Sequence, residues 1–464
     1  MLVSGVAPPL PAPQLATFLS QLAVLLAVAL GMGLLARRFG LPALAGELFG
    51  GVLLGPTVFG QLSPAAFDRL FPRDGMPLLD AASQLGVLLL VALTAARLDT
   101  GFLRRRAGDV ARVGLGALLL PLAAGIGLGW LLPESLLPAG VPRGLVAGFF
   151  DVVMCVTAIP VIAKTLADLG LVHRDVGQLI LAAAALDDTA GWVLLAAVSA
   201  LATGAAGAGG VGAAGAGVPG AGASVAGSSV SVAAASAGHS ALLIGLAATA
   251  LLAAAALLGR PLARLGLRLA GHTAPAATAY AVLVTLLFGA AAGGAGLEPV
   301  LGAFLAGIAV LRRLNPAHLA GLNTVTLWVL APIFMAGIGL RIDLTVLAQP
   351  IVAATVTAAV AVAVTSKLAG AYLGARASRM THWQGLALGA GMNSRGMVEV
   401  IIALVGLRVG LLTPAMFTVV VLIALVTSLA APPMLRAAAH RIPTDPTETA
   451  RHEQQLAWTH KEQT

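Results

Sequence analysis

Charged residues, aromatic residues and cysteine are all scarce in this chain of 464 residues. Asp, Glu, Lys and Arg together make up 10% of it and aromatic residues 4%, whereas hydrophobic residues make up 59%. A soluble chain of this length would form about two or three domains, and so few charged residues could not cover their surfaces. The few aromatic side chains, and basic residues scattered between apolar runs, argue against a nucleic-acid partner despite the net charge of +8.

The single cysteine, Cys155, excludes a disulfide within the chain and a metal site built from paired cysteines. Residues 1–17 lack the positive charge that begins a secretory signal peptide. We therefore expect residues 1–17 to form an outer segment, and the apolar run that follows to be a permanent membrane span.

Long apolar runs dominate the rest of the sequence, and the mean hydropathy is +0.96. Windows of about 19 residues predict an all-α polytopic membrane protein with thirteen transmembrane helices. The predicted spans lie near 18–36, 43–60, 78–96, 110–132, 144–169, 175–202, 240–258, 274–293, 297–311, 321–340, 349–375, 383–407 and 413–435.

Basic residues in the loops predict the orientation of these spans. With the N-terminus outside, the inner side carries sixteen Lys and Arg residues and the outer loops carry five. The inner set is Arg37, Arg38, Arg97, Arg104, Arg105, Arg106, Arg112, Lys164, Arg174, Arg260, Arg264, Arg268, Arg312, Arg313, Arg376 and Arg379. This excess follows the positive-inside rule and places residues 436–464 in the cytoplasm as a short tail of a cell-membrane protein.

Residues 203–239 are rich in glycine and hold no charged residue, so we expect a flexible outer loop there. The loop separates six predicted spans from seven. Each half contains a polar-centred segment, beginning at Met154 in the first and at Met392 in the second. Similar segments at matching places of two halves are typical of an inverted-repeat transporter.

Two adjacent carboxylates, Asp187 and Asp188, lie in the apolar run LILAAAALDDTAGWVLL. A carboxylate at that depth costs several kcal/mol unless it is paired, hydrated or protonated, and it is a marker of ion transport. The two are about 100° apart around a helix, so one can face a partner charge while the other faces a cavity. Lys367 stands alone in another apolar run, and we expect it to be the partner.

Two further segments predict interrupted helices. Pro160 disfavours helical backbone before it, and a break would leave carbonyl oxygens and the Thr157 hydroxyl as ligands for an alkali cation. The alternative for Thr157 is a simple kink in which its hydroxyl bonds to its own helix. The second segment holds Asn393, Ser394 and Gly396 around Arg395, and Arg395 and Glu399 have the i, i+4 spacing of an ion pair. The pair is either a structural lock or in direct contact with the ion.

Together these pieces resemble the second family of monovalent cation:proton antiporters, in the sodium/hydrogen exchanger superfamily. The resemblance covers roughly residues 40–435. The segments that carry it are GELFGGVLLGPTVFG, TAIPVIAKTLADLGL, LDDTAGW, LGAFLAGI, Lys367, MNSRGMVEVIIALVGL and ALVTSLAAPPML. The NSRGMVE segment resembles that of the bacterial and plant cation/H⁺ exchangers, which favour K⁺ or Na⁺.

The resemblance implies a homodimer, with a panel domain for dimerisation and a six-helix core for transport. It implies panel helices near 18–96 and 274–340, core helices near 110–202 and 349–435, and a linker helix near 240–258. It also implies two crossed broken helices, which here would carry Thr157 and Asn393. Asp188 corresponds to the aspartate that binds the cation, and Asp187 to the neighbour that pairs with the lysine.

This sequence departs from the family pattern at Arg97, where an acidic residue is common, and at Asp151, to which we assign no role. The tail contains no GxGxxG segment, so we expect no nucleotide or other cofactor. The resemblance implies exchange of K⁺ or Na⁺ for H⁺, with membrane lipid as the other partner and no enzymatic activity. A gated cation channel or a solute symporter on a related fold is the alternative. An intramembrane aspartyl protease is disfavoured because adjacent aspartates on one helix point apart.

Overall fold

The computed structural model describes residues 11–39, 43–72, 75–187, 257–268, 273–295, 299–342, 344–396 and 410–456, with a few isolated residues at 190–250 and 399–407. Within these ranges all regular elements are helices, and no strand occurs. Nine helical segments of this described part are long and apolar enough to cross a membrane. They correspond to nine of the thirteen predicted spans. The other four, near 175–202, 240–258, 297–311 and 383–407, include residues outside the described ranges, so the count of thirteen stays a prediction.

The helices have the following bounds. In the first half they are α1 (Ala12–Arg38), α2 (Ala43–Leu54), α3 (Phe59–Leu62), α4 (Pro64–Leu70), α5 (Met76–Ala96), α6 (Thr100–Arg105), α7 (Ala107–Leu131), α8 (Arg143–Cys155) and α9 (Ile159–Asp168). In the second half they are α13 (Ala274–Gly294), α14 (Pro299–Ala309), α15 (Ala320–Val325), α16 (Ala331–Gly339), α17 (Pro350–Ala377), α18 (His382–Met392), α20 (Pro414–Ala439) and α21 (Pro446–Leu456). Residues 175–187 and 257–268 are also helical.

Local sequence signals explain where several of these helices begin. The spanning helices α1, α5, α13, α17 and α20 have proline in the first turn, where its missing N–H is not needed. Thr381 and Gln384 form a capping box at the start of α18, in which each side chain accepts a backbone N–H of the other residue. The Thr413 hydroxyl likewise accepts the N–H of Met416 at the start of α20.

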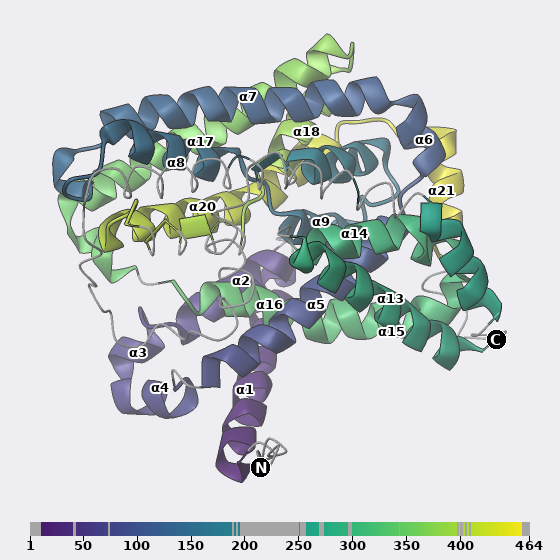
Figure 1. Ribbon diagram of the computed structural model, residues 1–464, viewed down its shortest axis with the longest axis horizontal. Coiled ribbons are helices and arrows are strands. Elements are labelled where there is room, and N and C mark those ends of the chain that lie inside the picture. Colours follow the sequence, from purple (N-terminus) through teal and green to yellow (C-terminus); the bar gives the residue numbers. More distant parts are fainter. Residues whose placement is uncertain are drawn as a thin grey trace, which may run out of the picture.

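The helices pack in two layers (Figure 1). We call α7, α8, α17, α18 and α20 the upper layer, and α1, α2, α5, α13, α14 and α16 the lower layer. Helix α9 lies between them and contacts α2 and α5. Whether the two layers act as the core and panel domains of the resemblance stays a prediction.

Glycine permits the closest helix contacts in both layers. A Cβ added at Gly370 of α17 would lie 2.1 Å from the carbonyl oxygen of Gly116 on α7. A Cβ added at Gly51 of α2 would lie 2.0 Å from the carbonyl oxygen of Ala336 on α16. Small residues at such crossings let membrane helices approach until their backbones touch.

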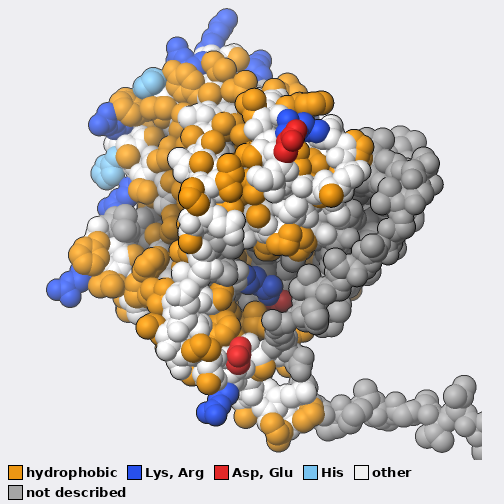
Figure 2. Space-filling model, turned by 90° about the vertical axis from the view of Figure 1, so that its left-hand side faces the viewer, with side chains coloured by type: hydrophobic (Ala, Val, Ile, Leu, Met, Phe, Trp, Pro, Cys, Tyr) orange, Lys and Arg blue, Asp and Glu red, His pale blue; other side chains and the backbone are white. Residues whose placement is uncertain are grey.

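The outer surface is largely apolar. Helix α7 exposes Leu115, Leu119 and Leu131, and α13 exposes Leu283 and Leu287. Figure 2 shows hydrophobic side chains spread over one face, with few charged side chains and most of those near its edge. Exposed apolar helices of this length face lipid, so the chain is a multi-pass membrane protein.

The C-terminal helix α21 lies beside α6, at the right of Figure 1. The Glu448 carboxylate pairs with Arg174 at 2.8 Å and accepts the N–H of Asp175 at 2.7 Å. The imidazole rings of His173 and His452 are 4.3 Å apart between centroids. Helix α21 is therefore held by side chains of the turn that follows α9.

Candidate ion-binding site

The first predicted break is present. Helix α8 ends at Cys155, Val156 and Ala158 have extended backbone, and α9 begins at Ile159 with Pro160 in its first turn. Proline lacks the N–H that would continue the hydrogen-bond ladder and disfavours helical backbone just before it, which favours a break at this place. The Thr157 hydroxyl oxygen lies 3.3 Å from the carbonyl oxygen of Met392, across the break, so Thr157 is not a simple kink residue bonded to its own helix.

The second break crosses the first. Helix α18 ends at Met392, the backbone is non-helical over 393–396, and Glu399 is helical again. The N–H of Ala158 donates to the carbonyl of Ser394 at 3.0 Å, which joins the two extended segments directly. A Cβ at Gly396 would lie 2.7 Å from the Val161 side chain, so this glycine permits the crossing.

Asp187, Thr157 and Lys367 meet beside this crossing. One carboxylate oxygen of Asp187, Oδ2, accepts the Thr157 hydroxyl and lies 2.5 Å from Nζ of Lys367. The Lys367 ammonium also donates to the carbonyl oxygen of Cys155, which the end of α8 leaves free. All three side chains are buried. The predicted contact between Asp187 and Lys367 is thus present.

The second charge pair ties the two broken helices together. Arg395 and Glu399 form the i, i+4 pair expected from their spacing, with Nη1 to Oε1 at 2.5 Å. The guanidinium also donates to the carbonyls of Val153 at 2.7 Å and Met154 at 2.6 Å, in the last turn of α8. These carbonyls have no partner within their own helix, so Arg395 supplies the donors that the break removes.

Unpaired polar atoms remain around the crossing. In the described part of the chain, Oδ1 of Asp187, both amide atoms of Asn393 and the Ser394 hydroxyl have no hydrogen-bond partner. Each is buried, and a buried polar group without a partner costs free energy that a bound ion or water would offset. These are oxygen and amide groups of the kind that hold alkali cations.

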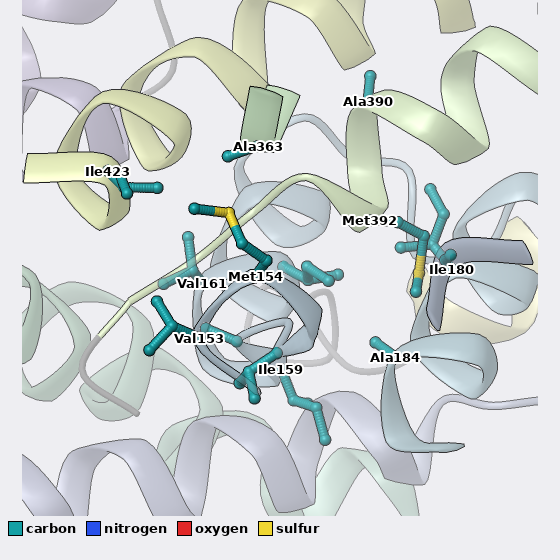
Figure 3. Close-up of a cluster of buried hydrophobic side chains, with 14 of the residues drawn as sticks. Val153, Met154, Ile159, Val161, Ile180, Ala184, Ala363, Ala390, Met392 and Ile423 are labelled. Carbon is teal, nitrogen blue, oxygen red and sulfur yellow. The ribbon is translucent and has the colours of Figure 1, made fainter. Parts of the chain in front are cut away.

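An apolar shell surrounds the crossing (Figure 3). It includes side chains from α8, α9, α17, α18, α20 and the helical residues 175–187. Those labelled in the figure are Val153, Met154, Ile159, Val161, Ile180, Ala184, Ala363, Ala390, Met392 and Ile423. Because this shell is apolar and of low dielectric, the charges within it interact strongly with one another.

Intramembrane charge pairs at crossed, broken helices agree with what the resemblance implies. Comparison with protein families shows which family the chain belongs to. The family model described as sodium/hydrogen exchanger, transmembrane, matches residues 24–440. The chain belongs to the sodium/hydrogen exchanger family.

Individual relatives agree with this membership. The chain is 28% identical over 427 residues to the Na(+)/H(+) antiporter NhaS4 of Synechocystis, with 90% of this chain and 96% of that one covered. It is 27% identical over 422 residues to the Na(+)/H(+)-K(+) antiporter GerN of Bacillus cereus, with 90% and 95% covered. It spans less than half the length of the plant and yeast cation/H(+) antiporters that it also matches.

The fold has a solved counterpart. The sodium proton antiporter MjNhaP1 from Methanocaldococcus jannaschii, solved at pH 8, matches with a TM-score of 0.62 and 16% identity. The match covers 92% of this chain and 97% of that one. At this identity the likeness establishes the exchanger fold alone.

Two further aspartates of this exchanger-family chain, Asp188 and Asp151, lie in predicted membrane spans. Asp188, the predicted cation and proton site, lies outside the described residues, directly after Asp187. Asp151 is a buried residue of α8, and the thiol of Cys155 lies 3.9 Å from its Oδ1. We assign it no role.

Sequence reasoning missed a third buried charge set in this exchanger fold. The position of Lys164 near the end of a predicted span places it among the basic residues of the inner loops, but in the structure it is buried within α9. Its ammonium lies 3.2 Å from Glu47 on α2 and 3.0 Å from Asp168 at the end of α9. The i, i+4 spacing of Lys164 and Asp168 was the available signal.

Proposed function

We propose that this chain is a secondary active transporter, not an enzyme, that exchanges a monovalent cation, K⁺ or Na⁺, for H⁺ by alternating access. Membership of the exchanger family supports the proposal, as do the names of the two relatives that match over nearly their whole length. The observation that carries it is the buried Asp187–Lys367 pair, bonded to Thr157 where two broken helices cross. Ionisable residues buried within membrane spans mark ion pathways.

The proposed exchange depends on one carboxylate that holds either a proton or a cation. We assign this role to Asp188, one residue beyond the pair. Oδ2 of Asp187 is then bound by Lys367 and by the Thr157 hydroxyl, whereas its Oδ1 has no hydrogen-bond partner among the described residues. Thr157, Asn393 and backbone carbonyls freed at the breaks supply neutral oxygen ligands for the dehydrated cation. Since proton and cation compete for the same carboxylate, the release of one permits the binding of the other.

Alternating access would follow from movement of the upper layer, which carries the breaks, against the lower layer. We further propose that the lower layer forms the interface of a homodimer in the cell membrane, with the N-terminus outside. The excess of basic residues in the predicted inner loops supports this orientation.

The test is cation-induced recovery of a pH dye in proteoliposomes, run with Li⁺, Na⁺, K⁺ and Rb⁺. Asp188→Asn should abolish exchange because the neutral amide can neither take a proton nor neutralise a cation. The matched control is Asp68→Asn, the same change on an exposed residue of α4, which should exchange at the wild-type rate. Exchange by Asp188→Asn above a few per cent of wild type would remove Asp188 from the role. Cation flux that moves without opposing protons would instead identify a channel.

A further inference from the structure

Helix α2 is fixed to its neighbours in the lower layer. A Cβ at Gly46 would lie 2.0 Å from the carbonyl oxygen of Met32 on α1, and one at Gly51 would lie 2.0 Å from that of Ala336 on α16. Backbones that touch at two crossings resist sliding, because any relative shift creates a clash or a void. Helices α1, α2 and α16 therefore form one rigid unit.

Helix α9 is joined to α2 by charges. The Lys164 ammonium bridges Glu47 of α2 and Asp168 of its own helix, at 3.2 and 3.0 Å. The second oxygen of Asp168, Oδ2, accepts the N–H of Leu44 in the first turn of α2, at 3.0 Å. The side chains of Lys164, Glu47 and Asp168 are 2%, 4% and 5% exposed, so the network is largely buried. Asp168 also lies 3.7 Å from the half-exposed Arg37 of α1.

The energetics of such a network suit a contact that opens and closes. Removing ions from water costs about as much as their attraction returns, so a dry ion network is near balance with its hydrated, separated form. An apolar contact of the same area would instead favour the closed form, because opening it would expose apolar surface to water. Glu47 also keeps one oxygen, Oε2, that has no hydrogen-bond partner among the described residues, which further lowers the preference for the closed form.

The network lies between a cavity and the candidate ion site. A cavity of about 650 Å³ is lined by Arg37, Ala43 and Asp168, and by residues at the end of α20. Asp187 and Thr157 do not line this cavity. Helix α9 runs from the break at Thr157 to Asp168, so the same helix joins the ion site at one end to the cavity at the other. By the predicted orientation, this cavity is on the cytoplasmic side.

We propose that Glu47, Lys164 and Asp168 form a latch between α2 and α9 that closes the cytoplasmic path to the ion site and opens once in each transport cycle. These are positioning residues, since none of them contacts Asp187, and their role rests on the proposed exchange function. With the latch closed, the path ends at the cavity. When α9 moves away from α2, water hydrates the three charges and the path continues to the crossing of the broken helices.

The first test measures access past the latch. Val52 is buried on α2, eight residues beyond Leu44, and Val52→Cys in a Cys155→Ala background makes the introduced thiol the one that reacts. A membrane-impermeant maleimide is added to vesicles whose cytoplasmic side faces out. Glu47→Gln keeps the size of the side chain but removes its charge, and it should raise the labelling rate at position 52 by about threefold or more. Asp109→Asn is the matched control, since its carboxylate pairs with Arg106 and Arg112 within α7 and its start. An unchanged rate in Glu47→Gln overturns the latch.

The second test separates a latch from a merely structural pair. If the closed latch limits access, Glu47→Gln should lower the KM for the cytoplasmic cation, because a larger fraction of molecules is open. A structural pair would raise KM or lower the amount of folded protein. Glu47→Cys with Lys164→Cys, joined by a short cleavable bismaleimide, should lose transport and regain it on cleavage. Transport at the unlinked rate while the linker is in place would overturn the proposal. Labelling needs no transport, so it still reports on the latch if exchange itself is absent.

Discussion

Replacing Lys367 by methionine tests the buried pair at the crossing. Methionine keeps most of the unbranched stem, so the apolar packing of α17 changes little, whereas the positive charge is lost. Asp187 then keeps only the Thr157 hydroxyl as a partner, and the carbonyl of Cys155 loses its donor. The substitution should destabilise the protein through uncompensated charge and not through lost volume.

The structure allows the magnitude to be worked out. Both side chains of the pair are 0% exposed, so water cannot replace the lost partner. Removing one member of a fully buried pair costs about 3–5 kcal/mol. In a chain of 464 residues this corresponds to a fall in Tm of about 3–5 °C, from the unfolding entropy per residue of soluble domains. Asp187→Asn in the same chain removes the stranded charge, so the double variant should recover at least half of the loss.

Thermal unfolding can be followed with a thiol-reactive dye, because Cys155 is the only cysteine and is 0% exposed in the folded protein. Tryptophan fluorescence gives an independent signal that does not depend on the neighbourhood of Cys155. The matched control is Thr357→Ala, on the exposed side of the same helix, where the hydroxyl bonds only to the carbonyl of Ala353. A double variant no more stable than Lys367→Met would show that the two charges do not compensate each other, and the reasoning would fail.

Two further predictions follow from contacts outside that pair. Glu399→Gln should lower Tm and leave the apparent K⁺ or Na⁺ affinity in proteoliposomes nearly unchanged, because it removes the charge that neutralises Arg395. A tenfold weaker affinity at unchanged Tm would place Glu399 in the ion path instead. Burial, together with the neighbouring His452, Arg174 and Arg451, lowers the pKa of His173 from 6.5 to about 4, so the docked tail holds this ring neutral. Once α21 undocks, the ring regains its ordinary pKa and binds a proton more readily, so docking is strongest above pH 6.5 and weakens as the pH falls towards 4. Hydrogen exchange of the α21 amides should therefore quicken from pH 7.5 to pH 5 after correction for the intrinsic rate, and His173→Gln should abolish the change; equal protection at both pH values would contradict this.

The sequence predicts the parts of the site that depend on one residue's own chemistry. Pro160 disfavours helical backbone at the residue before it, and the break lies directly before α9, which has Pro160 in its first turn. Lys367 is the only charge in a long apolar run, so it needs a partner, and Asp187 and Asp188 are two carboxylates in another apolar run. Hydropathy likewise located nine of the spans without any knowledge of how they pack.

Contacts to the backbone were not predictable in this way. Arg395 donates to the carbonyls of Val153 and Met154, which become free only because α8 ends there, and a free carbonyl leaves no mark on the residue type. Asp168 accepts the N–H of Leu44 for the same reason, at the start of a different helix. Such bonds depend on where helices end in space, which is a property of the fold.

Lys164 shows that the burial of a lysine cannot be predicted when its neighbours in the fold are unknown. Near the end of a predicted span it was counted as a loop residue on the inner side, since a lysine there usually extends to the membrane surface. Its carboxylate partners are on α2, more than a hundred residues earlier, and at the end of α9, so burial becomes possible only in the folded chain. Of the three buried charge sets, the one at Lys164 joins α9 to a helix of the lower layer, whereas Asp187–Lys367 and Arg395–Glu399 lie among the broken helices and α17. A movement of the broken helices against the lower layer would leave those two sets intact and would separate Glu47 from Lys164 and Asp168, which both belong to α9. We therefore expect transport to be sensitive there to charge and not to volume.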